Sequence, residues 1–283
     1  MTGSPDGACA TLDFESHGAV IRVSSAVGDA LELVRAALPP GSRPASGTTP
    51  DVVYHWRRRA GSAAPSELHV VTVQCPIETD ADDVACEHDA ADAADLLSRD
   101  AEFRVALHAR RGIFVHAGAL GWKGRAILVP GYTHMGKSTL TAALVAAGAT
   151  YYSDEYAVLD DAGCLHPFAR PMRLRHQGRK ASRHTAAELG GTAGTEPLPV
   201  GLIVSTRFEA GAVWEPRRVS AGKAALALLD NTVVTRFRPA EAMAATGAAA
   251  ARAVAVEGPR GEAAETARRI LRLADELFGQ GGG

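Results

Sequence analysis

A glycine-rich segment, Gly131 to Ser138, constrains the fold of this chain more than any other feature. The segment matches the pattern G-x-x-x-x-G-K-[ST] at every fixed position. An apolar run, Ala126–Val129, precedes it, and apolar residues with helical spacing follow it. A buried strand, a glycine-rich turn and a helix in this order direct backbone N–H groups and the positive end of the helix at a phosphate. The sequence therefore predicts an α/β fold with a P-loop.

The same pattern predicts ATP and Mg²⁺ as cofactors. In loops of this kind the lysine, here Lys137, reaches the β- and γ-phosphates, and the following hydroxyl, here Ser138, ligates Mg²⁺. Lysine is rare in the chain, which makes its presence in this loop more telling. The predicted cofactor contacts are Gly131, Tyr132, Thr133, His134, Met135, Gly136, Lys137, Ser138 and Thr139.

Two neighbouring carboxylates, Asp154 and Glu155, end the strand predicted directly after the P-loop helix. One carboxylate at this place is suited to lie near the metal, and the other to take a proton from an attacking hydroxyl. An ordinary polar turn after a strand is the alternative. The D-x-x-G and N-K-x-D motifs of GTPases do not occur together downstream, so that class is not expected.

A histidine, His116, ends the strand predicted before the P-loop strand. An imidazole there is suited to move a proton or to contact a phosphate. A purely structural histidine is the alternative, and the sequence leaves both open.

These three elements in succession resemble the HPr kinase/phosphorylase family, which has a His-Gly pair, a Walker A loop and an acidic pair in this order. More closely, residues 112–175 resemble HPr-kinase-related proteins of ribosomal-peptide biosynthesis, such as lasso-peptide precursor kinases. The resemblance implies a P-loop kinase core like that of ATP-dependent phosphoenolpyruvate carboxykinases. It implies that His116 and Lys137 are active-site residues and that Asp154 is the general base, with Glu155 where the family often has a second aspartate. Ser138 and Asp154 are then the predicted metal ligands.

The departures from the family bear on the acceptor. Thr133 and His134 replace the usual Ser-Gly pair of the loop, and the E-x-R-G-x-G signature of true HPr kinases has no counterpart. The segment around Arg260-Gly261 is only superficially similar and is given no role. HPr is therefore not the expected acceptor, and phosphorylase activity is not expected.

A basic stretch follows the acidic pair, and arginines near a phosphoryl group can neutralise its charge or clamp an acidic peptide. Arg173 and Arg175 alternate along a predicted strand and are the predicted substrate-binding residues, with solvated surface residues as the alternative. The other basic residues of the stretch are Arg170, Arg179, Lys180 and Arg183.

The sequence pattern changes near residue 111. We therefore predict an N-terminal α+β lobe of unknown role, residues 1–110, and a P-loop domain, residues 111–283. In the lobe we predict a hairpin of strands 12–14 and 19–23 around Gly18, a helix over 29–38, strands 51–56 and 68–73, and a helix that follows the acidic stretch 80–95 and ends near 111. In the second domain we predict strands at 113–116, 126–129, 150–152, 157–159, 201–205 and 213–215, and helices at 138–147, 223–229 and 263–278.

Composition excludes several classes of protein. A net charge of −2 argues against a dedicated nucleic-acid-binding protein, and no apolar run is long enough to cross a membrane. The four cysteines show neither a CxxC pair nor zinc-ligand spacing, and the start of the chain lacks a signal-peptide pattern. We expect a cytoplasmic protein with reduced thiols that binds neither nucleic acid nor membrane, and a homo-oligomer is compatible with the sequence.

The leading hypothesis is an ATP- and Mg²⁺-dependent kinase that transfers the γ-phosphoryl group to a hydroxyl, such as Ser or Thr of a peptide or small protein. Two alternatives remain: a nucleotide-binding accessory module or slow ATPase in a peptide-biosynthesis pathway, and a small-molecule kinase. The acceptor site has no motif that separates these three.

Overall fold

The computed structural model describes residues 9–60, 67–75, 82–87, 89–131, 136–174 and 182–279. The chain packs as two compact units, Met1–Arg111 and Gly112–Gly283. Both units combine helices with β-sheets, which confirms the mixed α/β class. Gly112 has a φ of +82°, a conformation that suits glycine, at the start of the second unit.

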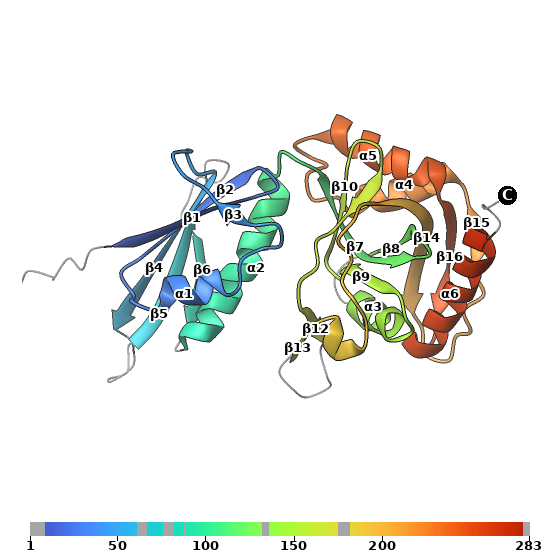
Figure 1. Ribbon diagram of the computed structural model, residues 1–283, viewed down its shortest axis with the longest axis horizontal. Coiled ribbons are helices and arrows are strands. Elements are labelled where there is room, and N and C mark those ends of the chain that lie inside the picture. Colours follow the sequence, from blue (N-terminus) through green and yellow to red (C-terminus); the bar gives the residue numbers. More distant parts are fainter. Residues whose placement is uncertain are drawn as a thin grey trace, which may run out of the picture. The chain divides into compact units, whose positions relative to one another are not determined.

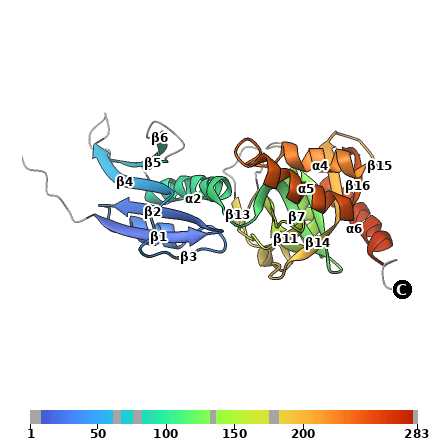
Figure 2. The same ribbon diagram turned by 90° about the horizontal axis from the view of Figure 1, so that it is seen from above.

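The first unit is a six-stranded sheet with helices on one side (Figures 1 and 2). The strand order is β3-β1-β2-β4-β5-β6, and all neighbours are antiparallel except β2 and β4. The elements are β1 (Ala10–Ser16), β2 (Ala19–Ser25), α1 (Ala30–Arg35), β3 (Arg43–Pro44), β4 (Val52–Ala60), β5 (Glu67–Gln74), β6 (Asp82–Glu87) and α2 (Ala90–His108).

Alternation of apolar and polar residues builds this sheet. Phe14, Tyr54 and Trp56 are almost fully buried, whereas their strand neighbours are partly exposed. Helix α2 packs against β2, β5 and β6 and contributes the buried side chains of Leu97 and Val105. The result is one helix-covered face and one polar face.

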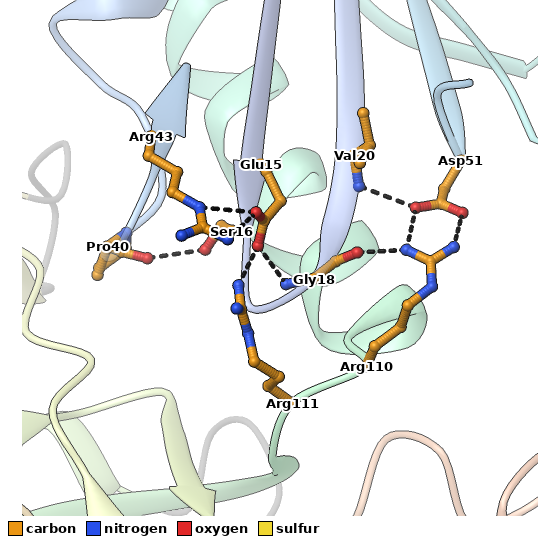
Figure 3. Close-up of polar contacts among 9 residues, drawn as sticks. All are labelled: Glu15, Ser16, Gly18, Val20, Pro40, Arg43, Asp51, Arg110 and Arg111. Carbon is orange, nitrogen blue, oxygen red and sulfur yellow. Dashed lines mark hydrogen bonds and ion pairs between the residues drawn. The ribbon is translucent and has the colours of Figure 1, made fainter. Parts of the chain in front are cut away.

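Hydrogen bonds and ion pairs connect the β1–β2 turn and its surroundings to the residues that follow α2 (Figure 3). His17 and Gly18 both have positive φ, as a two-residue type I′ hairpin requires. The guanidinium of Arg110 contacts both carboxylate oxygens of Asp51 and the carbonyl of Gly18, and Arg111 pairs with Glu15. These contacts tie the last residues of the first unit to its own sheet.

The predictions for the first unit are confirmed for the hairpin and for β4 and β5. The helix predicted after the acidic stretch exists, but it begins within that stretch, at Ala90, and ends at His108. Helix α1 is shorter than the predicted 29–38. Residues 82–87, within the acidic stretch, form the edge strand β6. Pairing with β5 decides that conformation, because the segment has little intrinsic β-propensity.

The second unit contains an eight-stranded sheet and a separate two-stranded one. Its first elements are β7 (Ile113–Trp122), β8 (Arg125–Pro130), α3 (Lys137–Ala146), β9 (Thr150–Ser153), β10 (Tyr156–Leu159), β11 (Cys164–His166), β12 (Met172–Leu174) and β13 (Ser182–His184). A 3₁₀ turn (Ala187–Leu189), β14 (Leu198–Phe208), β15 (Arg217–Val219), α4 (Ala221–Asp230), α5 (Pro239–Arg252), β16 (Val254–Arg260) and α6 (Ala263–Gly279) follow.

Three parallel strands, β8, β14 and β16, form the centre of the large sheet, with β7 antiparallel to β8 on one side and β15 antiparallel to β16 on the other. Ile127, Val129 and Leu202 face a core shared with α3 and α6. Helices α4 and α5 lie on the opposite face (Figure 1). Both faces are therefore covered, which explains why β8 reads as a continuous apolar run.

Most predicted elements of the second unit are confirmed, and β7 and β14 extend well beyond the predicted segments. The strand predicted at 213–215 is wrong, because the antiparallel partner of β16 is Arg217–Val219. Helix α5 and strand β16 were not predicted. The helix is too rich in alanine to show an apolar periodicity, and the strand contains Gly258-Pro259, a combination typical of a loop.

Helix α3 crosses β7 at Gly118, and this close approach positions the P-loop helix. A Cβ atom at Gly118 would lie 2.4 Å from the Oγ1 atom of Thr141, which is fully buried. We expect Gly118→Ala to lower the free energy of unfolding by about 1–3 kcal/mol through overpacking, measured by urea denaturation.

The matched control is Gly247→Ala in α5, where a Cβ atom would meet nothing within 4 Å. This control is expected to stabilise the protein by up to about 1 kcal/mol. Thr141→Ala should recover part of the loss when combined with Gly118→Ala. An unchanged stability of the Gly118→Ala protein would contradict the tight contact.

No helix in the described part of the chain combines the length and the apolar character that a membrane crossing requires.

Candidate functional site

The segment that matches the P-loop pattern connects the end of β8 to the start of α3. Gly136 is the N-cap of α3 and has a φ of +77°, which explains the glycine at this position. Lys137 is buried, and its Nζ atom donates to the carbonyl oxygen of Gly131. Ser138 is half-buried and Thr139 is exposed. The other predicted cofactor contacts, Tyr132, Thr133, His134 and Met135, lie outside the described residues.

Backbone hydrogen bonds bring the three sequence motifs together. The N–H group of Gly131 donates to the carbonyl of His116 at 3.3 Å. One residue on, the N–H group of Ala117 donates to the carbonyl of Glu155 at 3.1 Å. Strand β7 also pairs with β10, so that His116 lies opposite Tyr156. The histidine, the start of the P-loop segment and the acidic pair are therefore neighbours.

Asp154 lies in the interior of this site, with only 1% of its surface exposed. Its Oδ1 atom accepts a hydrogen bond from the hydroxyl of Tyr151 at 3.0 Å. Burial raises the pKa of Asp154, and the guanidinium of Arg170 opposes the rise. The nearby side chain of Ser138 also favours the charged carboxylate and so acts to lower its pKa. The carboxylate thus lies near Ser138, in the first turn of α3.

Arg170 bridges the two carboxylates. Its Nη2 atom lies 3.4 Å from Oε2 of Glu155, and its Nε atom lies 3.8 Å from Oδ1 of Asp154. Its side chain is only 10% exposed, so the ion pairs are poorly screened by water. This buried cation offsets the charge of two adjacent carboxylates.

His116 and Glu155 form the more accessible part of the site. Nδ1 of His116 lies 3.2 Å from Oε1 of Glu155, and the two side chains are 28% and 31% exposed. Burial lowers the pKa of His116 and outweighs the opposing charge of Glu155, which favours a neutral imidazole at pH 7. A neutral imidazole beside a carboxylate can accept or relay a proton.

Lys137 and the two carboxylates influence one another through charge. Burial lowers the pKa of Lys137, and the negative charges of Glu155 and Asp154 act in the opposite direction. The arrangement thus combines two buried cations, Lys137 and Arg170, with two carboxylates at the N-terminus of one helix.

The oxygen atoms at this place suit Mg²⁺ that arrives with a nucleotide. Such an ion needs only one or two protein oxygens, because phosphates and water supply the others. The Ser138 hydroxyl and the Asp154 carboxylate lie close to each other, and both are hard oxygen ligands. Within the described residues, no group of three or more His, Cys, Asp or Glu side chains is arranged to hold a metal by itself.

The predicted substrate-binding arginines are only partly described. Arg173 lies in β12, which pairs with β13 and contacts α3, and its side chain is half-buried. Arg175, Arg179 and Lys180 lie outside the described residues.

Sequence reasoning missed two contributors to the site. Tyr151 reads as an ordinary strand residue, and Arg170 is one basic residue among several. Neither has a motif. Tyr151 is close to Asp154 in the chain, but the alternation of a strand would not predict that the two side chains meet. Arg170 is brought to Asp154 by folding.

Comparisons of the chain with models of protein families, with curated proteins and with solved structures find no significant match.

Proposed function

We propose that the second unit is an ATP- and Mg²⁺-dependent kinase that transfers a γ-phosphoryl group to a hydroxyl, with Ser or Thr of a peptide or small protein as acceptor. One observation carries the proposal: Ser138, in the first turn of the helix after the Walker-type segment, lies close enough to the buried carboxylate of Asp154 to lower its pKa. A hydroxyl and a carboxylate so placed are the protein ligands that a nucleotide-bound Mg²⁺ uses.

In this proposal each residue has one task. Backbone N–H groups of the loop and Lys137 hold the β- and γ-phosphates, while Ser138 and Asp154 hold the metal. Asp154 is the general base, with His116 and Glu155 beside it to receive or relay the proton of the acceptor hydroxyl. Arg170 keeps both carboxylates in place. When bound, Mg²⁺ would neutralise part of the negative charge on the phosphates.

The kinase core is proposed to be of the kind found in HPr kinases and ATP-dependent phosphoenolpyruvate carboxykinases. The order of the elements supports this proposal: the histidine strand β7, the strand β8 before the loop, the helix α3 and strand β9 follow one another, and the acidic pair comes directly after β9. The parallel strands β8 and β14 also present their carboxyl ends at one edge, where ligands of open α/β sheets bind.

The test is to incubate the protein with Mg²⁺ and γ-labelled ATP and follow the label by mass. The acceptors are a peptide library that contains Ser and Thr, a panel of small alcohols, or none. Label on a Ser or Thr hydroxyl, absent with the Lys137→Met protein, is the expected result. Label on a small alcohol alone would favour a metabolite kinase. Label released only as free phosphate would favour a slow ATPase or accessory module. Absence of ATP binding would overturn the proposal.

A further inference from the structure

A second arginine, Arg260, reaches the P-loop segment from a distant part of the chain. It ends β16, and its side chain is only 3% exposed. Its Nη2 atom donates to the carbonyl of Gly136 at 2.9 Å, and its Nη1 atom donates to the carbonyl of Gly261 at 3.0 Å. Because β8, β14 and β16 are parallel, their carboxyl ends share one edge, and Arg260 therefore lies beside the loop that follows β8.

The positive charge of Arg260 has no ion-pair partner among the described residues. Its Nε atom is buried without a hydrogen-bond acceptor in that part of the chain. Glu262 is the single residue whose charge favours the protonated guanidinium, and burial nevertheless lowers the pKa of Arg260. One face of the guanidinium lies 5.5 Å from the ring centre of Phe208. A buried cation that contacts only carbonyl dipoles and an aromatic ring is costly unless an anion joins it.

The surroundings of Arg260 are also positive. Gly136, which Arg260 contacts, is the N-cap of α3, and the N-terminus of a helix carries a partial positive charge. A Cβ atom at Gly136 would lie 2.4 Å from Nη2 of Arg260, so this glycine is needed for the close approach as well as for its positive φ. The buried Lys137 follows directly. Cations do not normally gather at a helix N-terminus, whereas an anion at this place would be attracted by all three charges.

We propose that Arg260 is a binding residue for the phosphate chain of a nucleoside triphosphate at the P-loop, a role that rests on the function proposed above. In the bound state its Nε and Nη groups donate to phosphate oxygens, and the contact with the Gly136 carbonyl is exchanged for a charge-assisted pair. Arginine suits this task because its planar donors match two phosphate oxygens at once.

The experiment measures the dissociation constants of ATP and of inorganic pyrophosphate by calorimetry for the wild type and for Arg260→Met. Both ligands are expected to bind the variant about 10- to 100-fold more weakly, as is usual when a hydrogen-bonded ionic contact is removed. The dissociation constants of Arg260→Lys should lie between those of the wild type and Arg260→Met, because lysine keeps the charge and loses the planar pair of donors. Thermal unfolding without ligand should show no loss of stability in Arg260→Met, since an unpaired buried charge has been removed.

The matched control is Arg125→Met. Arg125 also lies over a phenylalanine ring, at 5.9 Å from the centre of Phe278, but it is exposed and begins β8 at the end remote from the loop. This variant should bind both ligands as the wild type does, so that loss of an arginine–aromatic contact alone is excluded as the cause.

Two failures are distinguishable. If the wild type binds neither ATP nor pyrophosphate, the proposed function itself fails. If the wild type binds them and Arg260→Met binds them equally well, only the role of Arg260 is overturned. Loss of the folded state in Arg260→Met, Arg260→Lys and Arg260→Gln alike would also overturn it, because the arginine would then be structural.

Discussion

Phosphoryl transfer by an Asp154→Asn protein is expected to fall by about 10²- to 10⁴-fold, the usual contribution of a general base. Asparagine has nearly the same size and can still accept the hydrogen bond from Tyr151. It has no negative charge to attract Mg²⁺ and cannot take the proton of the acceptor hydroxyl. Binding of ATP measured without Mg²⁺ should therefore remain near that of the wild type, while the rate of transfer collapses.

Single-turnover transfer from γ-labelled ATP measures this effect, and Asp160→Asn is the matched control. Asp160 also follows a strand of the large sheet, but it is 37% exposed and its carboxylate is occupied by His166 and the Cys164 N–H group. The control should transfer at the wild-type rate. Wild-type transfer by Asp154→Asn would remove Asp154 from the mechanism.

A comparison with Glu155→Gln assigns the base between the two neighbours. Asp154 is almost fully buried, whereas Glu155 is 31% exposed and lies beside His116. We expect the larger loss for Asp154→Asn, because that residue contacts Ser138 as well. A larger loss for Glu155→Gln would move the base to Glu155 and leave Asp154 as a metal ligand.

Replacement of Lys137 by methionine is expected to reduce transfer by about 10²- to 10³-fold, the effect of removing one preorganised donor at the developing charge. Methionine fills most of the volume of the lysine stem. The fold should therefore be retained, because a buried cation is replaced by an apolar group. The affinity for ATP should fall together with the rate, since Lys137 would contact the phosphates before and during transfer.

The control for this replacement is Lys223→Met. Lys223 is exposed in α4 and pairs with Glu257, so its loss should affect neither affinity nor rate. Stability is compared by urea denaturation of both variants. If Lys137→Met bound ATP and transferred phosphate like the wild type, the Walker interpretation of Gly131 to Ser138 would be wrong, whatever the acceptor.

The local sequence pattern was sufficient to predict an element wherever its own residues indicate its conformation. Strand β8 is a continuous apolar run between turn residues. Helix α3 begins directly after Gly136, a residue type that marks a sharp turn of the chain. In these segments propensity, periodicity and turn chemistry agree.

Local pattern failed where a partner decides the conformation. Strand β6 is acidic and exists through its pairing with β5. Strand β16 contains Gly258 and Pro259 and is held by its parallel pairing with β14. The misplaced strand at 213–215 has the same cause, since the pairing with β16 falls on Arg217–Val219.

The sequence alone identified the Walker-type segment with its lysine and hydroxyl, the acidic pair after the next strand, and the α/β class. Each of these depends on residues close together in the chain, so their types and spacing specify them. Only the tertiary structure decided which distant groups join them. Arg170 contacts Asp154, and Arg260 contacts Gly136 across 124 positions of sequence. The contact of Arg260 arises because β8 and β16, from separate parts of the chain, end at the same edge of one sheet. The order in which strands pair decides this, and local spacing does not encode it.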